Sequence, residues 1–194
     1  PINDIRDIKA VLDKNYKFEK ILTVENGTKK DIYNAFTKLS NLTTTNDYVL
    51  IYYSGHGKIK AEQAYWIPVD GSDNWGSGDW INISEIDIFL SEIKAHHLAV
   101  LVDSCFVGSK FKGLNLIDDV VIPDEEGYEK YLVSALNLRS RSVLSSGTTG
   151  QVSDTVKGTN NSRFALSIIN NLNVYNKRSY PLDLDKLTQL MKIT

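Results

Sequence analysis

Two continuous runs of apolar, β-favouring residues do most to constrain how this chain can fold. Residues 48–53 read Tyr-Val-Leu-Ile-Tyr-Tyr, and residues 98–102 read Leu-Ala-Val-Leu-Val. Runs of this kind are typical of strands that are covered on both faces, as in a parallel sheet. Such a sheet needs helices between its strands to cover it.

Helices and strands alternate along the rest of the chain. Apolar residues recur at helical spacing over residues 4–12, and Thr28 with Asp31 three positions later can cap a second helix. A cap near Ser84 begins a third helix, further helices are predicted over 164–172 and 184–191, and further strands over 19–24, 64–69 and 141–145. Residues 109–140 are predicted to be an irregular linker between the large and small parts of one domain over residues 1–194. The alternation predicts an α/β sandwich with a mostly parallel sheet.

Length, charge and cysteine content exclude several classes of protein. A chain of 194 residues fits a single medium-sized domain. The balance of 22 basic and 24 acidic side chains gives a net charge of −2, which argues against nucleic acid as a direct partner. No apolar run has the length of a membrane span, so we expect no membrane partner. The single cysteine allows no internal disulfide and fits a reducing compartment, which predicts a cytoplasmic location.

A structural metal site is not expected. Such sites need several Cys or His ligands, and the chain has only His56, His96 and His97 beside Cys105. His96 and His97 directly precede a predicted strand and should point to opposite faces. We predict no metal ligands and no cofactor.

Polar signatures follow both apolar strands at the point where each ends. Residues 54–57 read Ser-Gly-His-Gly and place His56 after the first strand, and residues 103–105 read Asp-Ser-Cys and place Cys105 after the second. The carboxyl ends of neighbouring parallel strands lie about 4.8 Å apart at one edge of a sheet, which is where ligands bind in such folds. His56 and Cys105 can therefore meet across a cleft.

This pair of side chains suits nucleophilic catalysis. The thiolate of Cys105 is the nucleophile, and His56 can accept the thiol proton and later donate one to a leaving amine. The flanking glycines let the backbone turn tightly at His56, and the N–H groups of Gly57 and Cys105 could form an oxyanion hole. A lone cysteine after an apolar strand is usually a small buried hydrophobe, and a lone His-Gly is usually a turn. Their joint occurrence at matching strand ends favours the catalytic interpretation.

These motifs resemble those of the clan that contains caspases, metacaspases and their bacterial relatives. The residues around Cys105 resemble the metacaspase and bacterial pattern rather than the Gln-Ala-Cys pattern of animal caspases, and weaker matches lie at residues 1–4, 145–154 and 162–165. The resemblance implies a caspase-like three-layer α/β/α sandwich and a cysteine endopeptidase that uses a Cys-His dyad and a thioester intermediate. It also implies a first core strand ahead of Pro1, whose absence would expose an edge of the sheet.

The P1 residue is the substrate residue on the amino side of the cleaved bond. Carboxylates near the nucleophile predict which P1 side chain the enzyme prefers. Asp103 lies two positions before Cys105, the resemblance to metacaspases places Asp4 and Ser54 at the same pocket, and Asp154 is a further candidate. Carboxylates bind arginine through charge-assisted, bidentate hydrogen bonds, so we predict cleavage after arginine, with lysine as the second choice. The alternatives are that Asp103 caps a helix or turn or orients the catalytic histidine, and that Asp4 caps the first helix.

Regulation and partners follow from the same hypothesis. The expected partners are a protein or peptide substrate and an activating partner or sensor domain, as is common for caspase-like enzymes. Basic residues between the two parts are potential sites of self-cleavage, namely Lys110, Lys112, Arg139 and Arg141. Calcium activation is implied only by the resemblance to some metacaspases, and the acidic residues at 118–119 and 124–126 match no known calcium loop.

Two other interpretations stay open. The chain could be a catalytically silent caspase-like domain that binds proteins, or a nucleotide-binding protein on a doubly wound sheet. The second is disfavoured because the sequence contains no Gly-x-Gly-x-x-Gly or P-loop pattern. Trp66 is expected in the core because it lies in a predicted strand, whereas Trp75 and Trp80 lie in a loop and are candidates for a substrate groove.

Overall fold

The fold is built on a parallel sheet of four strands in the order β1-β5-β7-β6. The strands are β1 (Tyr48–Ser54), β5 (His97–Asp103), β6 (Asn115–Leu116) and β7 (Ser140–Ser145). They are seen in a computed structural model, which describes residues 1–72, 78–105, 111, 115–116, 125–147, 156 and 158–178. The two apolar runs therefore pair directly, as β1 and β5.

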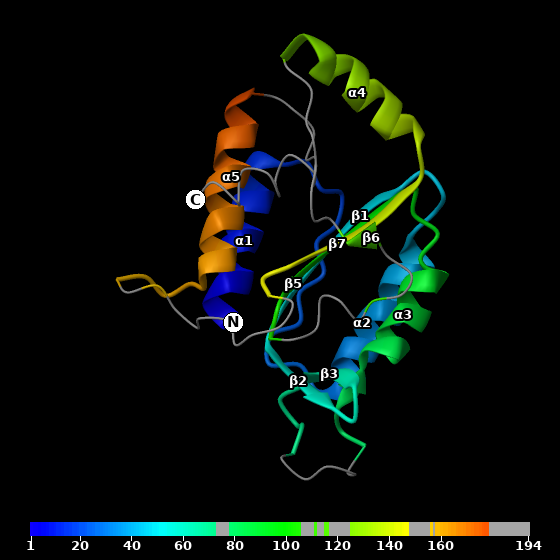
Figure 1. Ribbon diagram of the computed structural model, residues 1–194, viewed down its shortest axis with the longest axis vertical. Coiled ribbons are helices and arrows are strands. Elements are labelled where there is room, and N and C mark those ends of the chain that lie inside the picture. The colour runs from blue at the N-terminus through cyan, green and yellow to red at the C-terminus, as the bar shows by residue number, and fades with distance from the viewer. Residues whose placement is uncertain are drawn as a thin grey trace.

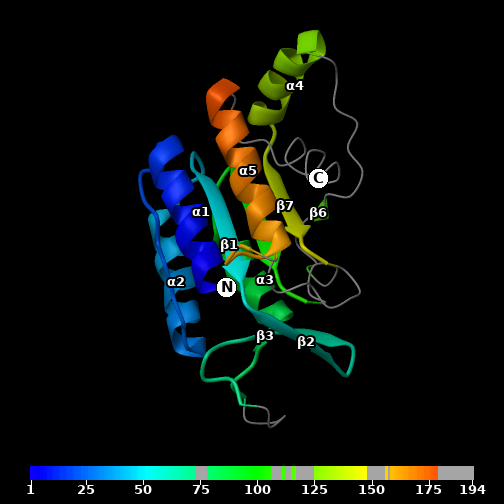
Figure 2. The same ribbon diagram turned by 90° about the vertical axis from the view of Figure 1, so that its left-hand side faces the viewer.

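Helices cover both faces of this sheet. Helices α1 (Ile2–Asn15) and α5 (Arg163–Arg178) lie on one face, and α2 (Lys29–Leu42) and α3 (Ile83–Glu92) lie on the other (Figures 1 and 2). In β5, Val100 and Val102 belong to the core on the α2–α3 side, whereas Leu101 belongs to the core on the α1–α5 side. The predicted α/β/α sandwich, with its central strands covered on both faces, is confirmed.

Side-chain caps begin helices α2 and α3, close to where the sequence predicts them. Thr28 and Asp31 form the predicted capping box at the start of α2, with 3.0 Å between the Thr28 nitrogen and the Asp31 carboxylate. The cap predicted near Ser84 is Asn82, whose side chain accepts the Ser84 N–H at 2.9 Å at the start of α3. Both helices begin where a side-chain oxygen satisfies an N–H that the first turn leaves without a partner.

A second, antiparallel sheet carries the chain away from the end of β1. It consists of β2 (His56–Lys60), β3 (Gln63–Ile67) and β4 (Ile81–Asn82). The β2–β3 hairpin projects beyond the sandwich at the end opposite helix α4 (Glu125–Asn137) (Figures 1 and 2). The backbone bends at Gly55, beside His56, and His56 itself is the first residue of β2.

Residues 19–24 do not form the predicted strand. Together with β1 they line a cavity of about 1190 Å³, and no backbone hydrogen bond is found for them among the described residues. A strand needs a neighbouring backbone to pair with, and this segment has none. The outer edge of β1 is open in the described sheet, so β1 is only partly buried although its sequence is that of a central strand.

The predicted irregular linker over residues 109–140 is also wrong in part. It contains the short strand β6 and the thirteen-residue helix α4. Helix α4 was not predicted because its apolar residues form a weak pattern. The helix predicted over residues 184–191 lies outside the described residues. Within the described residues, no helix is long and apolar enough to cross a membrane.

Candidate active site

The predicted catalytic pair lies beyond the carboxyl ends of the neighbouring strands β1 and β5. Ser54 of β1 is the register partner of Asp103 of β5, and the Gly55 N–H donates to the Asp103 carbonyl at 3.2 Å. His56 and Cys105 each follow two residues after this last pair, and both line the same cavity. His56 is exposed and Cys105 is partly buried. The sheet register thus places both residues that the sequence motifs singled out beyond the same end of the sheet.

Gly55 is required by close approach rather than by a tight turn. A Cβ atom at this position would lie 2.6 Å from the hydroxyl oxygen of Tyr53. The glycines with positive φ in the described part of the chain are Gly78 and Gly158, so the backbone at Gly55 has a conformation open to other residues. Glycine is thus needed beside His56, but to leave room for a neighbouring side chain and not to free the backbone.

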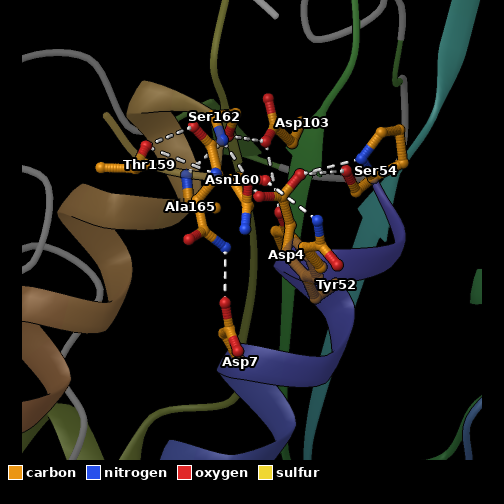
Figure 3. Close-up of polar contacts among 12 residues, drawn as sticks. Asp4, Asp7, Tyr52, Ser54, Asp103, Thr159, Asn160, Ser162 and Ala165 are labelled. Atoms are coloured by element: carbon orange, nitrogen blue, oxygen red, sulfur yellow. Dashed lines mark hydrogen bonds and ion pairs between the residues drawn. The ribbon is translucent and has the colours of Figure 1, made fainter. Parts of the chain in front are cut away.

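Two buried carboxylates lie beside the catalytic end of the sheet. Asp4 is 2% exposed and Asp103 is 6% exposed. Ser162 connects them, since its N–H donates to Asp4 at 3.0 Å and its hydroxyl donates to Asp103 (Figure 3). The Ser162 oxygen also accepts the Ala165 N–H at 2.9 Å and so caps α5. One serine thereby fixes the start of a helix and the spacing of two acidic side chains.

Hydroxyl groups from β1 complete this acidic cluster. The Tyr52 hydroxyl donates to Asp103 at 3.2 Å, and the Ser54 hydroxyl donates to Asp4 at 3.2 Å. The nitrogen of Pro1 lies 3.2 Å from the same Asp4 oxygen. Asp4 therefore does not act as a helix cap, and none of the hydrogen bonds among the described residues joins the Asp103 carboxylate to His56.

Burial dominates the electrostatics of the cluster. It raises the pKa of Asp103 above that of an ordinary aspartate, and the nearby Asp4 carboxylate raises it further, while hydrogen bonds from Ser162 and Tyr52 act in the opposite direction. Burial and the charge of Asp103 also raise the pKa of Tyr52, which stays a neutral donor. The cluster is therefore a buried acidic site, and a cation bound beside it would compensate the negative charge of its carboxylates.

The structure brings together three of the four predicted substrate-binding residues, namely Asp4, Ser54 and Asp103. Asp154 lies outside the described residues. Tyr52 and Ser162 also belong to the cluster and were not predicted. Tyr52 could have been found because it lies two positions before Ser54 and so shares its face of the strand. Ser162 could have been found as a cap before the predicted helix over residues 164–172.

The tryptophans Trp66 and Trp80 make structural contacts within the described part of the chain. Trp66 is 1% exposed and lies in the core, as predicted. Trp80 is partly buried, its indole N–H donates to the Ser72 carbonyl at 2.7 Å, and the Lys58 ammonium lies 5.0 Å from its ring centroid. Trp75 lies outside the described residues.

His96 and His97 lie at the opposite end of the strands from Cys105. Their rings are 4.7 Å apart, so the prediction that they point to opposite faces is wrong, because His96 lies in a bend before β5. Within the described residues, no group of three His, Cys, Asp or Glu side chains could hold a metal ion. The acidic residues at 118–119 and 124 lie outside the described part, and Glu125 begins α4.

The fold and the site together define a class of α/β protein that presents a cysteine and a histidine at adjacent strand ends. The family model of the caspase domain matches residues 1–193. The chain therefore belongs to the caspase-domain family, which is a family of cysteine peptidases.

Similarity to solved structures supports the fold. The chain is similar to a protein from Geobacter sulfurreducens whose crystal structure is known, with 16% sequence identity and a TM-score of 0.59. The match covers 97% of this chain and 76% of that protein. No curated protein matches the chain.

Proposed function

We propose that this protein is a cysteine endopeptidase that cuts polypeptides after a basic residue. The observation that carries the proposal is the register of β1 and β5, which sets His56 and Cys105 beyond one pair of strand ends on one cavity. His56 accepts the proton of the Cys105 thiol, and the sulfur attacks the carbonyl carbon of the scissile bond. The tetrahedral intermediate collapses to a thioester as His56 protonates the departing amine, and water then releases the acid product and the thiol.

Main-chain N–H groups at Gly57 and Cys105 are proposed to stabilise the oxyanion. Gly57 follows His56 in β2, and Cys105 follows the end of β5, so both lie at the same edge. Main-chain donors that the fold already holds in position lower the cost of stabilising the transition state.

The acidic cluster supports a basic P1 side chain. Asp4 and Asp103 are both buried, and Asp103 has a raised pKa because burial disfavours its charge. A guanidinium entering beside them would compensate that charge through paired hydrogen bonds, whereas an aspartate side chain would add a third negative charge. The proposed order of preference is arginine, lysine, and then neutral or acidic residues.

A panel of fluorogenic peptides tests both parts of the proposal. The peptides differ only at P1, with Arg, Lys, Leu or Asp, and we expect kcat/KM for Arg to exceed that for Leu and Asp by about a hundredfold. Turnover only of the Leu or Asp peptide would refute the pocket assignment while keeping the peptidase. Labelling of Cys105 by an electrophilic cysteine-protease probe without turnover of any peptide would leave the active-site thiol intact but refute peptide cleavage. Absence of both would favour a silent binding module.

The predicted self-cleavage sites differ in how firmly the fold holds them. Arg141 lies in the central strand β7, and its guanidinium donates to the Leu90 and Ile93 carbonyls, so its backbone is held in the fold. Arg139 is exposed between α4 and β7. Lys110 and Lys112 lie outside the described residues.

We expect self-cleavage after Arg139 and not after Arg141. Ser140 pairs with His97 at the start of β5, and the seven residues of β5 span about 20 Å to the catalytic end, so cleavage at Arg139 should occur between molecules. Mass spectrometry should show cutting of Cys105→Ala protein at Arg139 when wild type is added, at a rate that rises with wild-type concentration. A rate independent of concentration, or a cut after Arg141, would contradict this prediction.

A further inference from the structure

We propose that Tyr53 is a positioning residue that holds the backbone of His56 in place. This inference rests on the proposed function, because it concerns how the catalytic imidazole is kept beside the thiol. His56 is exposed, so packing around its own side chain cannot fix where it lies. The backbone that carries it must be held instead, and Tyr53 is the side chain that reaches it from the core.

The hydroxyl of Tyr53 is hydrogen-bonded to the backbone at the base of the hairpin. It donates to the His56 carbonyl at 3.1 Å, and burial raises its pKa, so it stays a protonated donor. His56 and Ile67 are register partners at the first rung of β2 and β3. The hydroxyl therefore holds the first rung of the hairpin at the point where it leaves the sandwich.

The ring of Tyr53 is anchored firmly enough to serve as a support. It stacks on the Trp66 ring with centroids 3.7 Å apart and planes within 5°. Trp66 is 1% exposed, stacks on Phe36, and is the register partner of Gly57. The absence of a Cβ at Gly55 leaves the space in which the Tyr53 hydroxyl lies. A chain of packed groups thus runs from the core to the residues on either side of His56.

This arrangement predicts a specific kinetic effect. The hydroxyl touches neither the thiol nor the acidic cluster in the hydrogen bonds described for it, so its loss should leave substrate binding intact. A shift of the hairpin base would misplace the imidazole, and small misplacements of a catalytic group cost one to two orders of magnitude in rate. We expect Tyr53→Phe to lower kcat about tenfold and leave KM within about twofold.

Tyr16→Phe is the matched control. Its hydroxyl also donates to a main-chain carbonyl, that of Leu172, at 2.9 Å, but it joins α1 to α5 away from His56. We expect both variants to lower the melting temperature by similar small amounts, whereas only Tyr53→Phe changes kcat. Gly55→Ala, which forces a methyl group against the Tyr53 hydroxyl, should reproduce the kcat effect from the other side.

Two further measurements keep this proposal separate from the proposed function. The first is the rate at which iodoacetamide alkylates Cys105 as a function of pH, and we expect Tyr53→Phe to shift the profile part of the way toward that of His56→Ala. If His56→Ala leaves the wild-type profile unchanged, the dyad itself is wrong. The second is hydrogen–deuterium exchange of residues 55–67, which we expect to be faster in Tyr53→Phe and unchanged in Tyr16→Phe. Equal exchange in wild type and Tyr53→Phe would overturn the positioning role, whatever the activity.

Discussion

Replacing Cys105 by alanine should abolish cleavage of the Arg peptide, and replacing His56 by alanine should lower kcat by about 10⁴-fold or more. In the proposed mechanism the thiol forms the bond to the substrate, and no other cysteine is present in the chain to replace it. The imidazole both generates the thiolate and protonates the amine. Because the two groups act as a unit, the double variant should be no worse than the Cys105→Ala variant.

Matched variants distinguish this chemistry from damage to the fold. Ser104 is 2% exposed, directly precedes Cys105, and its hydroxyl has no hydrogen-bond partner among the described residues, so Ser104→Ala should retain nearly full activity. His96→Ala removes an imidazole from the opposite end of β5 and should do the same. The decisive measurement is kcat with active sites counted by probe labelling. If Cys105→Ala keeps more than about one thousandth of the wild-type kcat, Cys105 is not the nucleophile.

Asp103→Asn should have two opposite effects, a loss of activity on Arg peptides and a gain in stability at neutral pH. The loss should be about a hundredfold in kcat/KM, because the amide keeps the shape of the side chain but removes the charge that pairs with a guanidinium. Activity on a P1 Leu peptide should change much less. The gain in stability is expected because the folded protein holds a buried carboxylate whose charge burial disfavours.

The pH dependence of this stability gain follows from proton linkage. The pKa of Asp103 is higher in the folded state than in the unfolded state, so the folded protein binds more protons between the two values and its free energy of unfolding falls as pH rises through that interval. In Asp103→Asn this side chain cannot ionise, so the free energy of unfolding does not fall in this way as the pH rises. The variant's advantage in melting temperature should therefore be present above the folded pKa and disappear below the ordinary pKa of aspartate.

Asp7→Asn provides the control for this experiment. Asp7 lies on α1 near the cluster, but it is exposed and its carboxylate accepts a hydrogen bond from Asn161 at 2.8 Å. The same chemical change at this site should alter neither the preference for Arg over Leu nor the pH dependence of stability. If Asp103→Asn behaves like Asp7→Asn in the peptide assay, Asp103 does not bind the P1 side chain.

The local pattern of the chain was enough to predict the main elements and to place the proposed reactive pair at strand ends. The apolar runs of β1 and β5 are long and uninterrupted, and runs of this kind predict strands that are covered on both faces, as in a layered α/β fold. Because each run leads directly into a polar motif, His56 and Cys105 had to lie near strand ends. The capping box of Thr28 and Asp31 was visible for the same reason, since all its partners are within three residues.

What depends on contacts between distant parts of the chain was decided only by the tertiary structure. Ser162 joins Asp4 and Asp103 across 158 and 59 positions of sequence, and no local pattern encodes such a bridge. Residues 19–24 have a strand-like composition, but a strand exists only where another backbone satisfies its hydrogen bonds. The role of Gly55 likewise depends on where the Tyr53 ring packs. Local sequence singled out the residues that we propose to react, and the packing of α1, α5 and the sheet decided which residues lie near the strand ends that carry them.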